Sequence, residues 1–437
     1  MRPIGVDLFA GAGGMSLGFE QAGFNVVAAV EIDPIHAAAH SFNFPQCTVL
    51  AQSVSDLTGT DIRKAADIGN RNVDVVFGGA PCQGFSLIGQ RALDDPRNSL
   101  VKDFVRLVVE LDASYFVFEN VKGITVGKHS QILRELIQEF QDRGYEVVLP
   151  WRVLNASNFE VPQDRERLIL MGAKKGLRIP DYPAPLTQAA GKQRKHDAHL
   201  PIGPTCKDAL GDIPDAEEYP ELLDSDTVHV DWGSPSAYAK IMRGISKNSD
   251  YFGYKRIWDS SLLTSSLRTN HSELSRSRFA ETLMGQVEPV SRFFKLPADG
   301  VSNTLRAGTD SARGAFTSPR PIHFQYSRCI TVREMLRLHG FPDWFRTHTT
   351  KWHGARQVGN AVPPPLARAV ANSVMKAAGH KPTAPKEPLL LGDEKLLFLD
   401  MGAAARHFEI DVPIKQRDRK DGTKKSPEKT AELCSYS

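Results

Sequence analysis

The chain has little of what marks a secreted, metal-bound or membrane protein. Its 437 residues include only five cysteines, far apart and without a Cys-x-x-Cys pair. This pattern argues against a disulfide framework and against a zinc site. No segment approaches the roughly 18 uninterrupted apolar residues of a membrane span. The first residues show no basic stretch followed by an apolar core, so no secretory signal is expected. We therefore expect a reduced, cytoplasmic protein without metal ligands and without a membrane partner.

A large charge of either sign is also lacking. The 54 Lys and Arg residues against 51 Asp and Glu residues leave a formal net charge of +3, which as a bulk figure indicates no polyanion binder. The charge is nevertheless uneven, because residues 208–231 hold nine Asp/Glu and no Lys/Arg, whereas residues 238–328 hold 14 Lys/Arg and seven Asp/Glu. Basic residues with aromatic neighbours, as in Tyr251-Phe252-Gly253-Tyr254-Lys255-Arg256, suit contacts with phosphates and grooves. Most of the lysines are expected to form only a solvated face.

The first 175 residues alternate β-branched apolar runs with helix-like stretches. We predict strands at 4–9, 26–31, 73–78, 115–119, 145–153 and 168–172, a possible strand near 48–51, and helices at 14–22, 99–111 and 130–143. This alternation predicts a parallel, doubly wound α/β sheet.

From Arg178 onward prolines are frequent and the periodicity is poor. Helix signals return near residue 330, where Thr331 and Glu334 have the spacing of a capping box, and three prolines at 363–365 open a helix to about residue 378. We expect an N-terminal catalytic part, a loop-rich insert, a completion of the catalytic domain and a C-terminal tail, at residues 1–175, 176–328, 329–379 and 380–437.

A glycine-rich loop, Asp7-Leu8-Phe9-Ala10-Gly11-Ala12-Gly13-Gly14, joins the first predicted strand to the first helix. Glycines let this backbone approach a ligand closely while the helix N-terminus faces it. The loop does not have the Gly-x-Gly-x-x-Gly spacing of a dinucleotide site. This disfavours a flavin or nicotinamide oxidoreductase and favours a ligand without phosphate, S-adenosylmethionine. Glu31 closes the second strand, where an acidic residue suits ribose hydroxyls, and Asp56 follows the possible third strand, within reach of an adenine amino group.

A cysteine and a glutamate follow two further strands. Cys82 lies in the Gly/Pro turn after the strand at 73–78, at the edge where open α/β sheets bind ligands. Glu119 ends the next strand, so it should lie beside Cys82, and its apolar surroundings could raise its pKa and let it act as an acid. A thiol, with an ordinary pKa of about 8.5, needs local help to act as a nucleophile. The alternatives are that Cys82 is a small core residue, as expected for the other four cysteines, and that Glu119 is a cap.

Six motifs, in the family's order, resemble those of DNA (cytosine-5) methyltransferases of the bacterial type. They are residues 7–14, Pro81-Cys82-Gln83, Glu119-Asn120-Val121, Gln163-Asp164-Arg165-Glu166-Arg167, Arg333-Glu334 with Leu338-His339-Gly340-Phe341-Pro342, and Gln357-Val358-Gly359-Asn360-Ala361-Val362-Pro363-Pro364. The resemblance spans residues 4–174 and 299–376. It implies a doubly wound S-adenosylmethionine-dependent methyltransferase (Rossmann-like) sheet with a smaller, loop-rich target-recognition domain at 176–328.

The resemblance also implies a mechanism. The Cys82 thiolate adds to C6 of a cytosine flipped out of the duplex while Glu119 hydrogen-bonds N3. C5 then takes the methyl group of S-adenosylmethionine, and loss of the C5 proton expels Cys82. Arg165 and Arg167 lie two apart on a strand-like segment and share one face. By resemblance Arg167 contacts O2 of the base, Arg165 supports Glu119 and the loop, and Asn120 braces the turn that carries Cys82.

The remaining site residues follow from the same resemblance. The cofactor is expected at Asp7, Phe9, Gly11, Gly13, Gly14, Glu31, Ile32, Asp56, Leu57, Pro81, Asn360 and Val362. DNA contacts are expected at Gln83, Ser86, Thr304, Leu305 and Arg306.

We therefore predict a sequence-specific DNA cytosine-5 methyltransferase that binds S-adenosylmethionine and double-stranded DNA and works as a monomer at the nucleoid. A separately acting cognate restriction endonuclease is a candidate partner. The first alternative is a tRNA cytosine-5 methyltransferase, although such enzymes usually lack so long an insert and carry a Cys-Phe-Thr element that is not found here. The second is a catalytically inactive DNA-binding module, against which the intact Cys82, Glu119 and Arg167 argue. An exocyclic amino methyltransferase would need an Asp/Asn/Ser-Pro-Pro-Tyr-like element, which is also not found.

Overall fold

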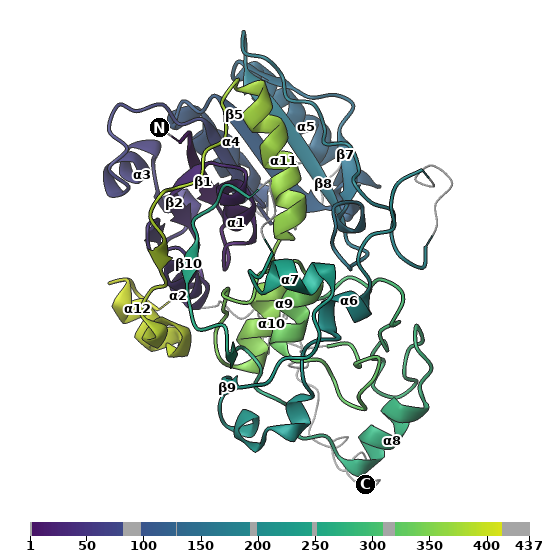
Figure 1. Ribbon diagram of the computed structural model, residues 1–437. Coiled ribbons are helices and arrows are strands. Elements are labelled where there is room, and N and C mark those ends of the chain that lie inside the picture. Colours follow the sequence, from purple (N-terminus) through teal and green to yellow (C-terminus); the bar gives the residue numbers. More distant parts are fainter. Residues whose placement is uncertain are drawn as a thin grey trace, which may run out of the picture.

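The computed structural model describes residues 2–81, 98–127, 129–192, 199–246, 251–308 and 320–412. Within these ranges eight strands form one sheet with helices on both faces, and a second, smaller lobe lies below it in Figure 1. The strands of the sheet are β1 Ile4–Leu8, β2 Asn25–Val30, β3 Thr48–Leu50, β4 Val75–Gly78, β5 Tyr115–Val121, β6 Tyr145–Val147, β7 Arg152–Asn155 and β8 Glu166–Lys174.

The sheet has the order β3-β2-β1-β4-β5-β8-β6, with β7 also paired to β8. β1 to β5 pair in parallel, as predicted. The predicted parallel direction is wrong for β8, which runs antiparallel to β5, β6 and β7. Only residues 156–165 separate β7 from β8, and this connection is shorter than the crossover that parallel pairing requires. The predicted strand at 145–153 is divided into β6 and β7, because Pro150 between them has no N–H to donate to the ladder.

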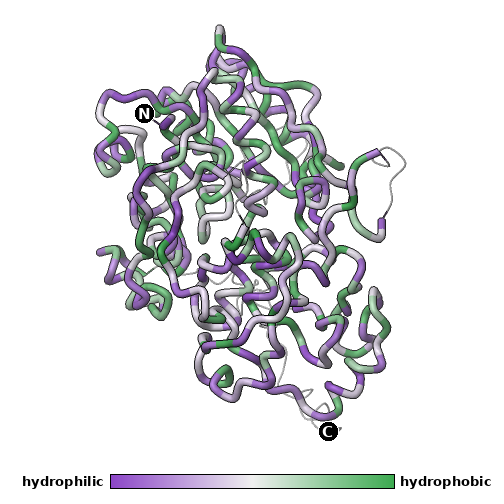
Figure 2. The backbone as a smooth tube through the Cα atoms, in the orientation of Figure 1, coloured by the Kyte–Doolittle hydropathy of each residue, from purple (hydrophilic) through white to green (hydrophobic). Residues whose placement is uncertain are grey.

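Helices with apolar faces cover the sheet on both sides. Helices of the described ranges are α1 Gly14–Gln21, α2 Pro34–Asn43, α3 Gly59–Ala65, α4 Ser99–Glu110, α5 His129–Asp142, α6 Cys206–Leu210, α7 Ala237–Met242, α8 Glu273–Glu281, α9 Val332–Leu338, α10 Lys351–Asn360, α11 Pro364–Ala377 and α12 Met401–His407. α1 and α11 pack together on one side of the sheet, where Phe19 stacks on Phe77 with 3.7 Å between ring centroids. α4 and α5 pack on the other side, where Phe116 stacks on Phe140, also at 3.7 Å. In Figure 2 the strands of the sheet are among the hydrophobic stretches of the chain.

Local signals explain where several helices begin. Asp33 caps α2 by accepting the N–H groups of Ile35 and His36, and Pro34 occupies the first helical turn. The predicted capping box of Thr331 and Glu334 is confirmed at the start of α9. α11 begins at Pro364, within the predicted proline run. Cys47, Cys206 and Cys329 are buried, as expected of core residues, and Cys434 lies outside the described residues.

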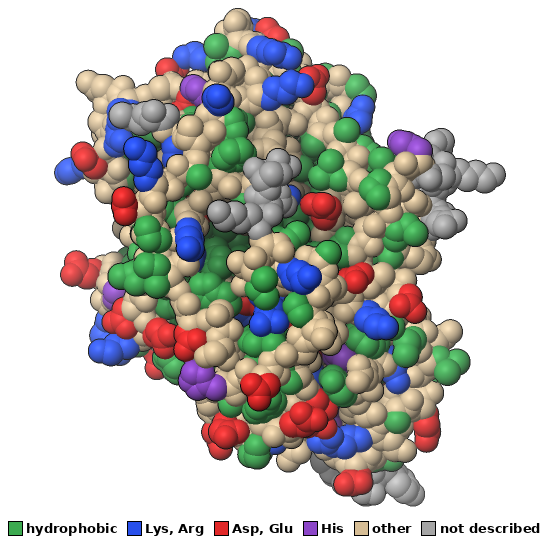
Figure 3. All heavy atoms as spheres, in the orientation of Figure 1, with side chains coloured by type: hydrophobic (Ala, Val, Ile, Leu, Met, Phe, Trp, Pro, Cys, Tyr) green, Lys and Arg blue, Asp and Glu red, His purple; other side chains and the backbone are tan. Residues whose placement is uncertain are grey.

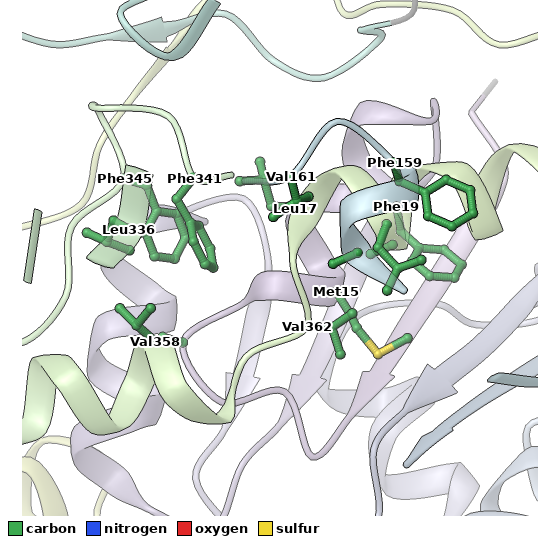
Figure 4. Close-up of a cluster of buried hydrophobic side chains, with 14 of the residues drawn as sticks. Met15, Leu17, Phe19, Phe159, Val161, Leu336, Phe341, Phe345, Val358 and Val362 are labelled. Carbon is green, nitrogen blue, oxygen red and sulfur yellow. The ribbon is translucent and has the colours of Figure 1, made fainter. Parts of the chain in front are cut away.

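The second lobe combines the insert with part of the C-terminal region. α9 and α10, which we predicted as part of the catalytic domain, lie with α6 and α7 in this lobe (Figure 1). Buried Arg337 of α9 fixes this packing, because its guanidinium donates to Asp212 of the insert at 3.0 Å and to Asp343. Figure 4 shows Leu336 and Val358 of this lobe in the same buried cluster as the α1 side chains. The two lobes therefore share a continuous core. Of residues 329–379, which we predicted to complete the catalytic domain, α11 is the helix that packs on the sheet.

The expected DNA contact at residues 251–256 is wrong for Arg256. Arg256 is buried and forms a two-bonded ion pair with Glu20 of α1, at 3.0 and 2.9 Å. The backbone N–H of Phe252 donates to the carbonyl of Gln21 at 2.7 Å, and the Arg368 guanidinium lies 4.3 Å from the ring centroid of Tyr251. The segment therefore straps the insert to α1 through the Arg256–Glu20 ion pair and the bond from Phe252 to Gln21.

We predicted a C-terminal tail from residue 380, but residues 380–412 pack against the rest of the fold. Strand β12 (Leu389–Leu390) pairs with strand β10 (Arg256–Ile257), and α12 packs on α2. The lobe below contains the further strand pair of β9 (Val228–His229) and β11 (Leu262–Leu263). In the parts of the chain that the structure describes, no helix is long and apolar enough to cross a membrane.

Candidate active site

The loop after β1 turns sharply into α1. Phe9, Gly11 and Gly13 have positive φ angles of 64°, 55° and 107°. A Cβ atom at Gly13 would lie 2.3 Å from the ring of Phe44, and one at Gly14 would lie 2.4 Å from the carbonyl oxygen of Val362. Gly13 and Gly14 are therefore required by close packing. At Gly11, in contrast, no atom lies within 4 Å of such a Cβ, so the backbone there borders open space.

Glu31 is fixed against this loop by two backbone N–H groups. Its Oε2 accepts from Gly11 at 2.8 Å and its Oε1 accepts from Asp33 at 2.9 Å. Burial raises the pKa of Glu31, and the two N–H donors and nearby His36 oppose that shift. The next residue, Ile32, is 56% exposed although it is a large aliphatic side chain. The structure thus brings together a positioned carboxylate, an open glycine and an exposed apolar side chain.

Asp7 lies beneath the loop. Its Oδ2 accepts from the hydroxyl of Ser16 at 2.6 Å, and Nε2 of His40 lies 3.0 Å from the same hydroxyl. Burial raises the pKa of Asp7 to about 8 and lowers the pKa of His40 to about 3. The Asp7 side chain is therefore engaged within the protein, and Ser16 and His40 are site neighbours that the sequence analysis missed. Polar residues spaced four apart among apolar ones, Ser16 and Glu20 in α1 and His36 and His40 in α2, would have been the signal.

The other predicted cofactor residues differ in exposure. Asp56 is exposed on a short turn after β3, and the following Leu57 is buried. Pro81 is exposed after β4, and Asn360 is exposed at the end of α10. The contact of Val362 with Gly14 places the turn after α10 directly against the start of α1.

Glu119 and Asn120 of β5 hold the backbone that leads from β4 towards Cys82. A Cβ atom at Gly79 would lie 2.5 Å from Oε2 of Glu119, so the carboxyl packs on that glycine. The Asn120 side chain donates to the carbonyl of Ala80 at 2.8 Å. Cys82, Gln83 and Ser86 lie outside the described residues. β4 nevertheless ends at Gly78, four residues before the cysteine, and the Asn120 bond holds Ala80, two residues before it.

Glu119 also forms an ion pair with Arg167 of β8. Nε of Arg167 lies 2.8 Å from Oε1 of Glu119, and both side chains are 12% exposed. Burial raises the pKa of Glu119, and the charges of Arg167 and Arg165 oppose that shift. The carboxyl is thus held in one orientation with a pKa above its ordinary value, the state that suits a proton donor.

Arg165, one residue before β8, is completely buried. Its guanidinium donates to the carbonyls of Leu305, Gly359 and Ala361 at 3.0, 2.7 and 2.9 Å. Burial and the charge of Arg167 lower its pKa well below the ordinary value, while Glu119 opposes the shift. Its hydrogen bonds therefore hold backbone from two other segments, and its charge reaches Glu119.

The predicted DNA residues 304–306 run beside residues 163–165, directly before β8. The Thr304 hydroxyl donates to the carbonyl of Asp164 at 2.7 Å, and the Leu305 N–H donates to Oε1 of Gln163 at 3.1 Å. Leu305 is buried, whereas Arg306 is exposed. The face drawn in Figure 3 is hollowed between the sheet and the second lobe, and hydrophobic side chains lie in that hollow.

Comparison with known families gives a match over most of the chain. Residues 5–376 match the family described as C-5 cytosine-specific DNA methylase. The chain is 57% identical to the Type II methyltransferase M.XorII of Xanthomonas oryzae pv. oryzae over 431 residues, which cover 99% of this chain and 98% of that protein. It is 33% identical to the Type II methyltransferase M1.HphI of Haemophilus parahaemolyticus, with 85% and 86% of the two chains covered.

Among solved structures, the fold is similar to that of a protein described as a DNA modification methyltransferase encoded within a prophage of E. coli. The TM-score is 0.67 at 30% sequence identity, and the match covers 86% of this chain and all of the other.

Proposed function

The chain belongs to the C-5 cytosine-specific DNA methylase family, and from that premise we propose which residues carry each part of the reaction. The protein is a sequence-specific DNA methyltransferase that acts on C5 of cytosine. The tRNA methyltransferase and the inactive DNA-binding module that the sequence left open are not favoured by these relatives.

The methyl donor of this family is S-adenosylmethionine in general, and the loop after β1 fits it. Each oxygen of Glu31 accepts one backbone N–H and keeps a second lone pair for a ribose hydroxyl. The open backbone at Gly11 lets the ligand approach, and the exposed Ile32 offers an apolar surface to the adenine. When bound, the cofactor supplies an electrophilic methyl group on its sulfonium. Phe9, Asp56, Leu57, Pro81, Asn360 and Val362 complete the proposed cofactor site.

Glu119 is proposed as the acid that activates the cytosine. Its raised pKa lets the carboxyl carry a proton to N3 of the base, which draws electrons from the ring and favours addition of the Cys82 thiolate at C6. C5 of the resulting enamine is the nucleophile that takes the methyl group. Arg167 holds the carboxyl in place, and we propose that it also contacts O2 of the base. Release of the C5 proton to water then restores the double bond and expels Cys82.

The base has to leave the duplex to reach this site, at a cost of a few kcal/mol. We propose that residues 304–306 with Gln83 and Ser86 contact the opened DNA and that the insert reads the target sequence. The exposed guanidinium of Arg306 suits a phosphate or a guanine edge. We further propose that the enzyme works as a monomer on nucleoid DNA, beside a cognate endonuclease that acts separately.

The observation that carries the proposal is the position of Glu119. Its carboxyl packs on Gly79, three residues before Cys82, and pairs with Arg167. The test is transfer of labelled methyl from S-adenosylmethionine to duplex DNA, followed by digestion to nucleosides. Label in 5-methyldeoxycytidine is the expected result. Label in N4-methyldeoxycytidine, or transfer to tRNA and not to DNA, would refute the proposal. Bisulfite sequencing of DNA from expressing cells would then map the target.

A further inference from the structure

A closed ring of hydrogen bonds joins three parts of the chain that are far apart in sequence. The side-chain oxygen of Gln163 accepts from the N–H of Leu305 at 3.1 Å. The side-chain nitrogen of Gln163 donates to Nδ1 of His339 at 2.9 Å, and Nε2 of His339 lies 3.0 Å from the carbonyl oxygen of Ala361. Arg165 closes the ring, because it donates to the carbonyls of both Ala361 and Leu305.

The ring is buried and fixes the protonation of its histidine. Gln163, Arg165 and His339 are fully buried. A carbonyl oxygen can only accept, so Nε2 of His339 carries the hydrogen and Nδ1 accepts from Gln163. A second proton on Nδ1 would face the N–H of Gln163. Burial and the charge of Arg165 lower the pKa of His339 well below its ordinary value, which agrees with the neutral form.

One side of the ring holds the proposed DNA segment. Leu305, which contributes both its N–H and its carbonyl, lies between Thr304 and the exposed Arg306. Gly359 shows how closely this segment is held, since a Cβ atom there would lie 2.4 Å from the backbone nitrogen of Ala307 and 2.5 Å from the carbonyl carbon of Arg306.

The other side of the ring holds the proposed cofactor segment. Ala361 lies between Asn360 and Val362, and the carbonyl of Val362 packs against Gly14 at the start of α1. A movement of residues 360–362 would therefore stretch the bonds to His339 and Arg165, and through them it would act on Leu305. Arg165, two residues before Arg167, bonds both the DNA segment and the cofactor segment.

We propose that His339 and Gln163 are positioning residues that hold the DNA segment 304–306 and the cofactor segment 360–362 in one geometry, so that duplex DNA and cofactor each raise the affinity for the other. The proposal rests on the proposed function of these two segments. Neither side chain touches a substrate; both act through the backbone that they hold. Because coupling between two binding sites is reciprocal, it can be measured from either side.

The test measures binding of a duplex fragment that the wild-type protein methylates, with and without S-adenosylhomocysteine. For the wild type we expect the ligand to lower the DNA dissociation constant by about fivefold or more. In His339→Leu the factor should fall clearly below the wild-type value, because the link between Ala361 and Gln163 is gone and only Arg165 still bonds both Ala361 and Leu305. His339→Gln should retain most of the factor, because its amide can donate to Ala361 and accept from Gln163. Should the leucine variant fail to fold, His339→Met fills the same space with a flexible side chain and also breaks the link.

The matched control is His348→Leu. His348 is a buried histidine whose ring nitrogens lie 3.0 Å from the hydroxyl of Thr350 and 3.2 Å from the carbonyl of Leu399, outside the ring. This variant should lower the melting temperature and leave the factor unchanged. A wild-type factor of one, an unchanged factor in His339→Leu, or an equal loss in the glutamine variant or in the control would overturn the proposal. Failure of the proposed function would be seen separately, as a wild-type protein that does not methylate the fragment.

Discussion

Replacing Arg256 by methionine removes one half of the ion pair that straps the insert to α1. Its side chain and that of Glu20 are 0% and 3% exposed, and two hydrogen bonds join them. After the substitution the Glu20 carboxyl keeps hydrogen bonds from Gln46 at 2.8 Å and from the N–H of Tyr254 at 3.2 Å, and the charge of Arg2 still acts on it. Breaking a buried pair by removing one partner costs about 3–5 kcal/mol, and we expect a loss of that size in the free energy of unfolding.

Replacing both partners should recover a large part of this loss. In Glu20→Met with Arg256→Met no charge is left buried, and such double replacements are often close to neutral. The matched control is Arg143→Met, which breaks the exposed pair with Glu139 at 3.2 Å and should cost less than about 1 kcal/mol. Chemical denaturation followed by circular dichroism measures all of these variants.

DNA binding decides whether residue 256 has a second role. At a temperature well below the unfolding transition, the affinity of Arg256→Met for a duplex that the wild-type enzyme methylates should stay within about twofold of the wild-type affinity. Unchanged stability combined with weakened DNA binding would refute the structural role and restore Arg256 as a DNA contact.

Three further predictions concern the site. Glu119→Gln keeps the shape of the side chain but not its acidic proton, so kcat for methyl transfer should fall by about 10²–10⁴-fold. The control is Glu166→Gln, which breaks the exposed pair with Lys122 and should change kcat about twofold at most. Equal rates in the two variants would exclude Glu119 as the acid. Glu31→Ala should raise the calorimetric dissociation constant for S-adenosylhomocysteine by about tenfold or more, since hydrogen bonds to a charged group are worth about 1.5–3 kcal/mol, and an unchanged constant would contradict the proposed ribose contact. Burial raises the pKa of Asp7 from 3.8 to about 8, so the stability that its neutral form contributes is full below pH 3.8 and is lost as the pH rises towards 8. The wild type should therefore lose stability relative to Asp7→Asn over that range in denaturation curves, and a pH-independent difference would rule this out.

Much of the sheet domain could be predicted from the sequence because its signals are local. Alternation of strands and helices predicted β1 to β5, and the box of Thr331 and Glu334 predicted the start of α9. The antiparallel direction of β8 was not predicted. It depends on the short connection between β7 and β8, and the sequence alone did not show where these two strands end and begin. The interruption between β6 and β7 could have been inferred from Pro150.

Partners that depend on tertiary contacts were not predictable. Arg256 looked like a DNA ligand because nothing within the insert shows that Glu20, 236 residues earlier, is its partner. His339 looked like part of a motif without a role of its own, since its partners Gln163 and Ala361 meet only in the fold. The position of Glu119 beside the strand end before Cys82, in contrast, followed from the order of parallel strands, because their carboxyl ends share one edge.

The central claim is a covalent bond between Cys82 and the target cytosine. A duplex carrying 5-fluorocytosine at the mapped target position tests it, because C5 then has no proton to lose and the enzyme cannot be expelled after methyl transfer. With S-adenosylmethionine we predict a complex of wild-type protein and DNA that survives denaturing electrophoresis, and none with Cys82→Ser or with an unsubstituted duplex. No stable complex with the wild type, or an equal amount with Cys82→Ser, would contradict the claim.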